Sequence, residues 1–281
     1  MDEKGLGRRL QAVRREKGLT QQALCDGAGI SYSTLTKIER GAIKAPSIFT
    51  VMKMAEIMGV TLDELLGSVS PSLPSRRLGR TKSGVSFVFF DINGCLIRST
   101  QRGFVRLAEE TNSLPDVVET AYLNYSDDAD RGTLSMSDFD TKLAQRLHAL
   151  VDWQKIYLES VEVIQPMQDL ISWASEHYRV GLLTNSKPGL VPALRERNLI
   201  PNLNYDVIVD SSEVGLIKPE RAIYEKAQEW AGCEPGEILF VDDTRTNLFP
   251  AAELGWHVMQ FDGYDPEGST NNVRKALEPS S

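Results

Sequence analysis

Between residues 85 and 262, short apolar runs alternate with segments of helical periodicity, and this alternation most constrains the fold. The runs are Phe87–Phe90, Val180–Asn185, Val207–Val209, Ile238–Val241 and Val258–Phe261. Strands that alternate with helices of ordinary length are joined by right-handed crossovers and therefore form a parallel sheet. The sequence predicts an α/β domain over residues 85–266, followed by a polar tail, residues 267–281, that is expected to be frayed.

The stretch after the first strand interrupts this alternation. From about Thr100 to Val163 the chain is polar and apolar residues recur at helical spacing, as in Phe139–Leu150. This pattern predicts a small helical cap, residues 98–164, inserted between the first and second strands.

Polar motifs stand at the ends of the strands. In chain order they are Asp91-Ile92-Asn93-Gly94, Thr184-Asn185, Lys218-Pro219, and Asp242-Asp243 with Asn247. An open α/β sheet binds ligands at the carboxyl ends of its strands. A carboxylate nucleophile, a hydroxyl that holds phosphate oxygens, a lysine that neutralises charge and further carboxylates for Mg²⁺ are together what phosphoryl transfer requires.

These motifs resemble those of the haloacid dehalogenase (HAD) superfamily. The likeness is carried by Leu183–Ser186, Ser212–Glu220 and Phe240–Asp243, and the inserted helices resemble the small cap of the subgroup that contains the N-terminal phosphatase of soluble epoxide hydrolases. The resemblance implies a Rossmann-like parallel sheet, Mg²⁺ as cofactor and a phosphorylated small molecule as ligand.

The resemblance also implies a role for each matching position. Asp91 is implied as nucleophile and metal ligand, with the main-chain carbonyl of Asn93 as a second ligand. Asp243 is implied as the main acidic ligand, with Asp242 beside it in a direct or water-mediated role. Thr184 and Asn185 are implied to hold the phosphate, and Lys218 to pair with both Asp91 and the phosphate.

Asn93 departs from the pattern of the family. Most phosphatases of the superfamily have an aspartate there, which protonates the leaving group and later activates water. A carboxamide does neither, and losing general acid–base help costs about 10²–10⁴ in rate. Three interpretations stay open: a slow phosphatase, a sensor that binds a phosphorylated ligand without turnover, and an inert dimerisation scaffold.

The first 68 residues predict a separate helical bundle. Thr20 and Ser31 are good N-caps for two short helices joined by the Gly27-Ala28-Gly29 turn, which is the helix-turn-helix arrangement. A preceding helix has Arg8, Arg9, Arg14 and Arg15 among its outward residues, a fourth helix follows around Ile48–Ile57, and Thr61–Glu64 is a capping box that opens a fifth.

This segment resembles the phage-repressor (Cro- and Xre-like) helix-turn-helix family through Gly18–Leu24, Gly29–Ser31, Leu35–Gly41 and Leu62–Leu66. The resemblance implies that the third helix faces the major groove of double-stranded DNA and that the protein binds a two-fold operator as a homodimer. The alternative is that these polar side chains form only a solvated face. The implied DNA-binding residues are Gln21 and Arg40 at phosphates, and Tyr32, Ser33, Thr34 and Lys37 at the groove.

Charge differs between the two parts. Residues 1–84 hold 14 Lys+Arg against 8 Asp+Glu, whereas residues 85–281 hold 17 against 31. A basic head on an acidic body indicates that the head contacts a polyanion. Residues 69–84 are rich in Pro, Ser and Gly and predict a flexible linker, whose positive charges either contact DNA phosphates or keep it soluble.

The rest of the sequence is that of an ordinary cytoplasmic protein. Three cysteines lie far apart without a CxxC pair, which favours free thiols in a reducing compartment. No apolar run approaches 18 residues, so no membrane span is expected. We interpret the acidic run Asp127–Asp130 as a solvated turn of the cap rather than a cation site, and Tyr122, Tyr125 and Trp153 as cap packing rather than pocket lining.

Overall fold

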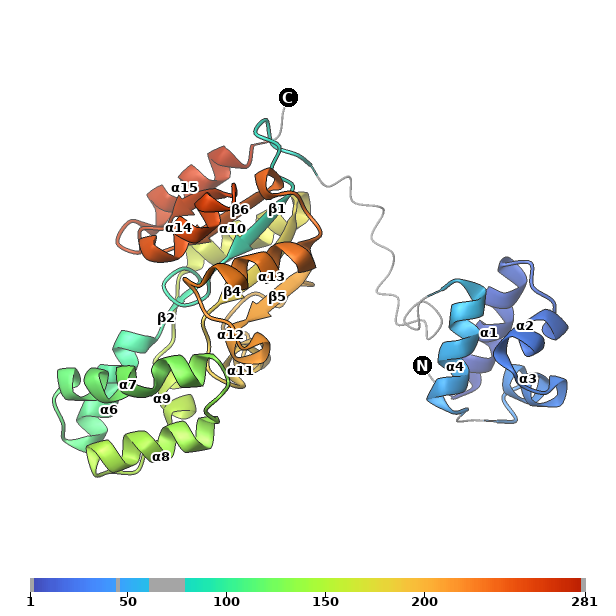
Figure 1. Cartoon of the computed structure of the whole chain (residues 1–281), viewed down its shortest axis with the longest axis horizontal. Coiled ribbons are helices and arrows are strands. Elements are labelled where there is room, and N and C mark those ends of the chain that lie inside the picture. The colour runs from blue at the N-terminus through green and yellow to red at the C-terminus, as the bar shows by residue number, and fades with distance from the viewer. Residues whose placement is uncertain (1–2, 44–45, 61–78, 279–281) are drawn as a thin grey trace. The chain divides into compact units, whose positions relative to one another are not determined.

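The computed structural model describes residues 3–43, 46–60 and 79–278 of the 281-residue chain. Contacts divide it into two compact units, Met1–Arg76 and Arg77–Ser281. Figure 1 shows both, coloured along the chain.

The first unit contains a helix-turn-helix. Its described helices are α1 (Glu3–Glu16), α2 (Gln21–Ala28), α3 (Tyr32–Glu39) and α4 (Ile48–Met58). The hydroxyls of Thr20 and Ser31 cap α2 and α3, as predicted, and Gly29 ends α2 with a left-handed backbone, φ 65°. Leu10, Leu24 and Leu35 are fully buried in the core between these helices. The fifth helix expected from Thr61 lies outside the described residues.

The second unit is built on a parallel sheet. Among the described residues its strand order is β5-β4-β1-β6-β7, and every neighbouring pair is parallel. The strands are β1 (Phe87–Phe90), β4 (Arg179–Thr184), β5 (Val207–Asp210), β6 (Ile238–Asp242) and β7 (His257–Gln260). The predicted α/β class is therefore confirmed.

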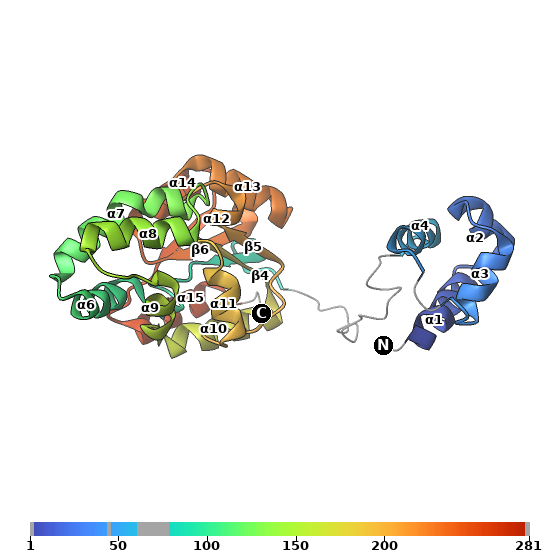
Figure 2. The same ribbon diagram turned by 90° about the horizontal axis from the view of Figure 1, so that it is seen from below.

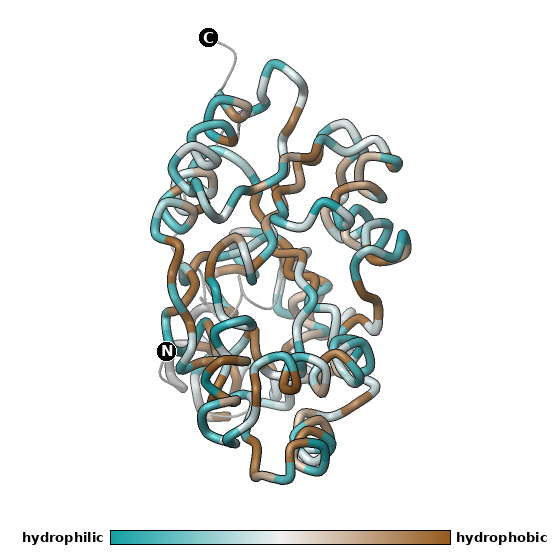
Figure 3. Tube along the Cα trace, turned by 90° about the vertical axis from the view of Figure 1, so that its left-hand side faces the viewer, coloured by the Kyte–Doolittle hydropathy of each residue, from teal (hydrophilic) through white to brown (hydrophobic). Residues whose placement is uncertain are grey.

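Helices cover both faces of this sheet (Figure 2). Phe87 and Phe89 of β1 point to the side covered by α13 and α14, whereas Val88 and Phe90 point to the side of α10, α11 and α15. A central strand buried on both faces is apolar at every position, as β1 is. Figure 3 colours the chain trace by hydropathy, from teal for hydrophilic to brown for hydrophobic residues. The helices and one 3₁₀ turn of this layer are α10 (Gln165–His177), α11 (Leu190–Glu196), α12 (Ser211–Val214), α13 (Arg221–Ala231), η1 (Pro235–Glu237), α14 (Arg245–Glu253) and α15 (Pro266–Ala276).

The cap is a cluster of helices inserted after β1, drawn in green in Figure 1. It contains α6 (Thr100–Thr111), α7 (Pro115–Asp130), α8 (Met136–Leu147) and α9 (Trp153–Glu159). The two chain connections to the cap form an antiparallel pair, β2 (Ile97–Arg98) and β3 (Glu162–Val163), so both ends of the insertion are tied together. Trp153 is fully buried among the cap helices, as expected for a packing residue.

Two expectations about irregular segments are wrong. Residues 79–84, assigned to the linker, pack on the second unit: Gly79 donates to the carbonyl of His177, and Thr81 is buried and bonds to Val85. The segment expected to be frayed forms α15, which packs against α10, and Leu277 just beyond its end is fully buried. Its apolar residues are few but lie on one face, which a polar average composition conceals.

Along the part of the chain that the structure describes, no helix combines the length and apolar character needed to cross a membrane.

Candidate functional site

Three adjacent strands bring the predicted motifs together. Because β4, β1 and β6 are parallel neighbours, Thr184, Asp91 and Asp242 all lie at the same edge of the sheet. Asp91 follows β1 directly, and its main-chain N–H donates to the carbonyl of Val241 in β6, which continues the strand pairing to the site.

Lys218 joins two of these carboxylates. Its Nζ lies 2.8 Å from Asp91 Oδ1 and 2.6 Å from Asp242 Oδ2, and all three side chains are almost completely buried. Burial would lower the pKa of Lys218, but Asp242 and Asp91 outweigh it and raise the pKa, so the ammonium stays charged. Burial raises the pKa of Asp91 to about 7; Lys218 opposes this rise, and the nearby Asp242 and Asp243 add to it.

Asp242 is placed differently from the implied metal ligand. Besides Lys218, its carboxylate accepts the main-chain N–H of Thr244 at 2.8 Å and the amide of Asn247 at 3.1 and 3.2 Å. The side chain is fully buried. With its oxygens occupied by protein donors, Asp242 holds Lys218 and the loop that follows β6.

Asp243 instead lies beside Asp91. One ligand atom each of Asp91, Asp243 and Cys95 lie within 4.8 Å of one another. Gly94 makes this approach possible, because its φ of 100° suits glycine and a Cβ there would collide with the Asp243 carboxylate. Two carboxylates are the hard oxygen donors that Mg²⁺ prefers, so Asp91 and Asp243 fit a magnesium ion, while the Cys95 thiol is a soft donor that does not.

The three uncharged polar residues of the site take different positions. Thr184 is buried at the end of β4. The Asn185 side chain accepts from the main-chain N–H of Lys218 at 2.8 Å and donates to the main-chain carbonyl of Lys218 at 2.9 Å, so it positions the lysine. Asn93 Oδ1 is buried and, among the described residues, has no hydrogen-bond partner. Asn93 therefore keeps an acceptor available for a ligand.

Two hollows meet at this edge of the sheet. An open pocket of about 1030 Å³ is lined by Asp91, Asn93, Lys218 and Asp243 and by Arg98 among others. A smaller cavity of about 170 Å³ lies between the core and the cap. Residues of both parts line it: Ile92, Asn93, Thr184, Asn185, Ser186, Lys187, Leu190 and Leu194 from the core, and Thr100, Tyr122, Asp130 and Tyr157 from the inserted segment.

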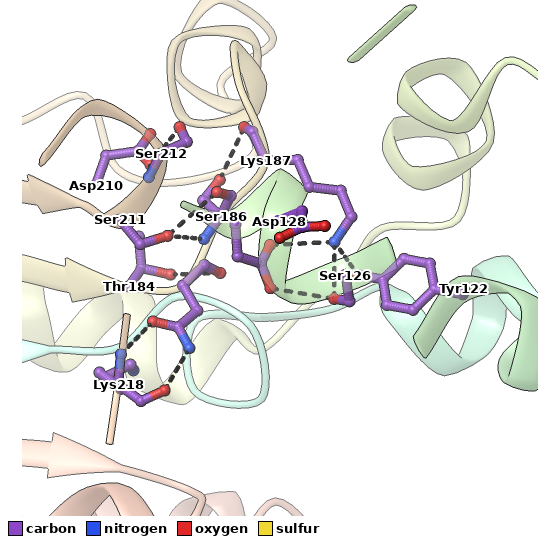
Figure 4. Close-up of polar contacts among 12 residues, drawn as sticks. Tyr122, Ser126, Asp128, Thr184, Ser186, Lys187, Asp210, Ser211, Ser212 and Lys218 are labelled. Atoms are coloured by element: carbon purple, nitrogen blue, oxygen red, sulfur yellow. Dashed lines mark hydrogen bonds and ion pairs between the residues drawn. The ribbon is translucent and has the colours of Figure 1, made fainter. Parts of the chain in front are cut away.

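Lys187 is a residue of this region that the sequence reasoning missed. It lies three residues after Thr184, is 1% exposed, and contacts the hydroxyls of Tyr122 and Ser126 and, at 3.1 Å, Asp130 Oδ1. Figure 4 shows its side chain reaching from the loop after β4 to α7. Asp130 is thus not part of a solvated turn, and Tyr122 both packs in the cap and lines the cavity. The sequence does show a lysine directly after Thr184-Asn185-Ser186, but it does not show the partners of that lysine, which are distant in sequence.

In the first unit, α3 presents the predicted DNA-facing residues. Tyr32, Ser33, Lys37 and Arg40 are exposed, and Tyr32 is 53% exposed although aromatic. Thr34 and Ser33 share hydrogen bonds with the Ser31 hydroxyl at the start of the helix. The exposed face of the second helix of the helix-turn-helix therefore has the polar and basic side chains that contact with DNA requires.

Glu39 is a second residue that was missed, and it corrects the expectation for Arg14. Arg14 is not outward but buried, with Nε 2.7 Å from Glu39 Oε1; Arg15 is exposed, and the side chains of Arg8 and Arg9 lie outside the described part. Gln21 donates to Glu39 at 2.7 Å and accepts from the Tyr32 hydroxyl at 2.7 Å. Gln21, assigned to a phosphate contact, thus links the buried ion pair to Tyr32.

Comparisons with known proteins agree with both units. A family model described as helix-turn-helix matches residues 10–65, and one described as haloacid dehalogenase-like hydrolase matches residues 85–255. An uncharacterised HTH-type transcriptional regulator of Bacillus subtilis is 41% identical over 59 residues, 21% of this chain and 84% of that protein.

Two comparisons concern the second unit. Bifunctional epoxide hydrolase 2 of Rattus norvegicus is 38% identical over 52 residues, 18% of this chain, and the chain spans only 9% of that enzyme. A HAD family enzyme of Bacteroides thetaiotaomicron, crystallised with magnesium and inorganic phosphate, superposes with a TM-score of 0.51 at 20% identity, over 64% of this chain and 96% of that one. This last likeness is one of fold.

Proposed function

The chain belongs to the haloacid dehalogenase-like hydrolase family, and from this premise we propose that it is a DNA-binding transcriptional regulator whose second unit binds Mg²⁺ and a phosphorylated small molecule. Turnover of that molecule is slow in this proposal. The supporting observation is the combination of a complete Asp91–Lys218–Asp243 arrangement with an asparagine at position 93, in a chain that carries a helix-turn-helix.

Each side chain has a part in holding the phosphate. Lys218, already charged and paired with Asp91, neutralises phosphate oxygens. Thr184 offers a hydroxyl at the end of the neighbouring strand. Asp91 and Asp243 would hold Mg²⁺, which shields the Asp91 carboxylate from the negative charge of the ligand.

Asn93 limits the chemistry that follows. When the Asp91 carboxylate attacks phosphorus, an aspartyl-phosphate forms and the ester oxygen leaves with the electron pair of the broken P–O bond. That oxygen needs a proton unless it is stable as an anion, and the Asn93 amide gives none. A bound ester with a poor leaving group should therefore dissociate more often than it is cleaved, which suits a sensor.

Hydrolysis of p-nitrophenyl phosphate with Mg²⁺ tests this part of the proposal. We expect weak activity in the wild type, because p-nitrophenolate leaves as a stable anion, and none in Asp91→Asn. The rate should be about 10²–10⁴ higher in Asn93→Asp, which restores the base that activates water to hydrolyse the aspartyl-phosphate. A wild type as fast as Asn93→Asp would refute slow turnover.

That outcome would favour a second candidate function, a phosphatase with an accessory DNA-binding head. The observation on its side is that Asp91, Lys218 and Asp243 are all present, although binding alone does not require a nucleophile. Asp91→Asn separates the two candidates, because it abolishes hydrolysis while leaving Lys218 and Thr184 to hold phosphate. A regulator should keep its response to the phosphorylated ligand in this variant, whereas a phosphatase should lose its function.

For the head, we propose recognition of a two-fold operator by a homodimer through α3, in the cytoplasm, where chromosomal DNA is accessible. Salt-dependent binding to the promoter region of the protein's own gene is expected. Replacing Tyr32 and Lys37 together by alanine should abolish sequence preference. Unchanged binding by this double variant, or a monomer at binding concentrations, would refute operator reading. Titrating the same complex with phosphometabolites and Mg²⁺ then tests regulation.

A further inference from the structure

The cavity between cap and core contains a buried cation that the proposed chemistry does not use. Lys187 has three N–H donors on its ammonium, and α7 supplies three acceptors: the hydroxyls of Tyr122 and Ser126 and a carboxylate oxygen of Asp130. These residues recur every fourth position, so they lie on one face of the helix. Lys187 thus belongs to the core by sequence and to the cap by its contacts.

This cluster ties the cap to the core. Lys187 Nζ lies 4.1 Å from the ring centre of Tyr122 and 5.0 Å from that of Phe139 in α8, so two cap helices contact one core side chain. Burial alone would lower the pKa of Lys187, but Tyr122 and Asp130 outweigh it and raise the pKa. Hydrogen bonds to charged groups contribute more than neutral ones, so separating α7 from the loop after β4 is costly.

Another tie between cap and core is of a different kind. Arg131, the next residue after Asp130, forms a two-bonded ion pair with Glu220, but both side chains are substantially exposed. Exposed pairs of this kind contribute little, about 0–1 kcal/mol. Arg131 therefore offers a matched comparison for the buried tie made by Lys187.

We propose, on the basis of the function above, that Lys187 limits the size of the organic group of the phosphorylated ligand. Lys187 lines this cavity together with Asn93 and Thr184, the residues next to the proposed phosphate position, and within the described part of the chain Asn93 Oδ1 has no hydrogen-bond partner. Its volume of about 170 Å³ equals that of about six liquid water molecules at ~30 Å³ each. A three-carbon polyhydroxylated group fits that space, and its hydroxyls can bond to Asn93 and Asp130; a fused aromatic ring does not fit.

Binding of two non-hydrolysable phosphonates, measured with Mg²⁺ by calorimetry, tests the inference. The probes are 2,3-dihydroxypropylphosphonate and 1-naphthylmethylphosphonate, with inorganic phosphate as the reference. We expect the wild type to bind the small phosphonate at least about tenfold more tightly, which is about 1.4 kcal/mol. Lys187→Met should bring this ratio near one without changing the affinity for phosphate, and Arg131→Gln should keep the wild-type ratio.

A second measurement does not depend on any ligand. Amide hydrogen exchange in α7 should be faster in Lys187→Met than in the wild type. Tyr122→Phe keeps the charge pair and should give a smaller increase, and this variant serves as the test if Lys187→Met folds poorly. An unchanged phosphonate ratio in a folded Lys187→Met, or equal affinities in the wild type, would overturn the size limit while leaving phosphate binding in place. A wild type that fails to bind phosphate would instead remove the proposed function, and this inference with it.

Discussion

Replacing Lys218 by methionine should destabilise the second unit in a pH-dependent manner. The substitution keeps most of the side-chain volume and removes a charge that lies 2.8 Å from Asp91 and 2.6 Å from Asp242. At an effective dielectric constant of about 20, each pair attracts with about 6 kcal/mol, most of which the desolvation of the three charges consumes. Removing one partner of a buried pair costs about 3–5 kcal/mol, and we expect this loss in the free energy of unfolding near pH 7.5 without Mg²⁺.

The pH dependence follows from Asp91. Its pKa in the folded wild type is raised to about 7, above the unfolded value of about 3.9, so the folded state binds the additional proton between these values. Stability therefore falls as pH rises through this window, by about 1.4 kcal/mol per unit. Above about pH 7 the wild type loses this slope. The variant should keep it to higher pH, because Lys218 no longer lowers the pKa of Asp91.

Tryptophan fluorescence during urea unfolding measures this effect cleanly, since Trp153, Trp173, Trp230 and Trp256 all lie in the second unit. Lys226→Met is the control: its ion pair with Glu229 is exposed and the variant should stay within about 1 kcal/mol of the wild type. A Lys218→Met protein that unfolds like the wild type from pH 5 to 8.5 would refute the electrostatic reasoning.

Three further substitutions test other parts of the molecule. Glu39→Gln leaves Arg14 buried without its partner and should cost the head about 3–5 kcal/mol, seen as faster amide exchange in α1–α3. Burial would raise the pKa of Glu39, but the hydrogen bond from Arg14 and its other partners lower it, so the wild-type head should lose this stabilisation below about pH 4.3, the usual value, and the variant should show no such loss. Leu277→Ala removes a fully buried side chain and should lower the stability of the second unit by about 2–5 kcal/mol. Unchanged stability would instead support a frayed tail. MgCl₂ should raise the melting temperature of the wild type and of Asp262→Asn, but not of Asp243→Asn.

Much of the site follows from sequence order. Asp91, Thr184 and Asp242 each end an apolar run, and parallel pairing of those runs is enough to bring the three ends to one edge. Lys218 follows no strand directly, and only its motif indicated that it reaches the same place. The structure adds what each of these groups contacts: Asp242 and Asn185 hold Lys218, so their own polar atoms are engaged by the protein.

The same limit explains the wrong assignments. Asp130 sits in an acidic run and Arg14 in a basic one, and a run of like charges is ordinarily solvated. Arg14 is buried and Asp130 is half-buried here because one opposite charge, Glu39 or Lys187, arrives from a distant part of the chain. Residues 266–276 read as a polar tail because the buried apolar face of α15 consists of only Val273, with Leu277 just beyond the end of the helix.

The sequence by itself therefore determined the two folds, the order of the strands' polar ends and the substitution at Asn93, because these depend on local periodicity and on residue types at fixed spacing. The tertiary structure alone decided which charges are paired, that Asn93 Oδ1 has no donor among the residues that the structure describes, and that Lys187 joins the loop after β4 to the cap. Those facts depend on contacts between residues more than twenty positions apart, and a burial cost or an ion pair exists only once both partners have been brought together.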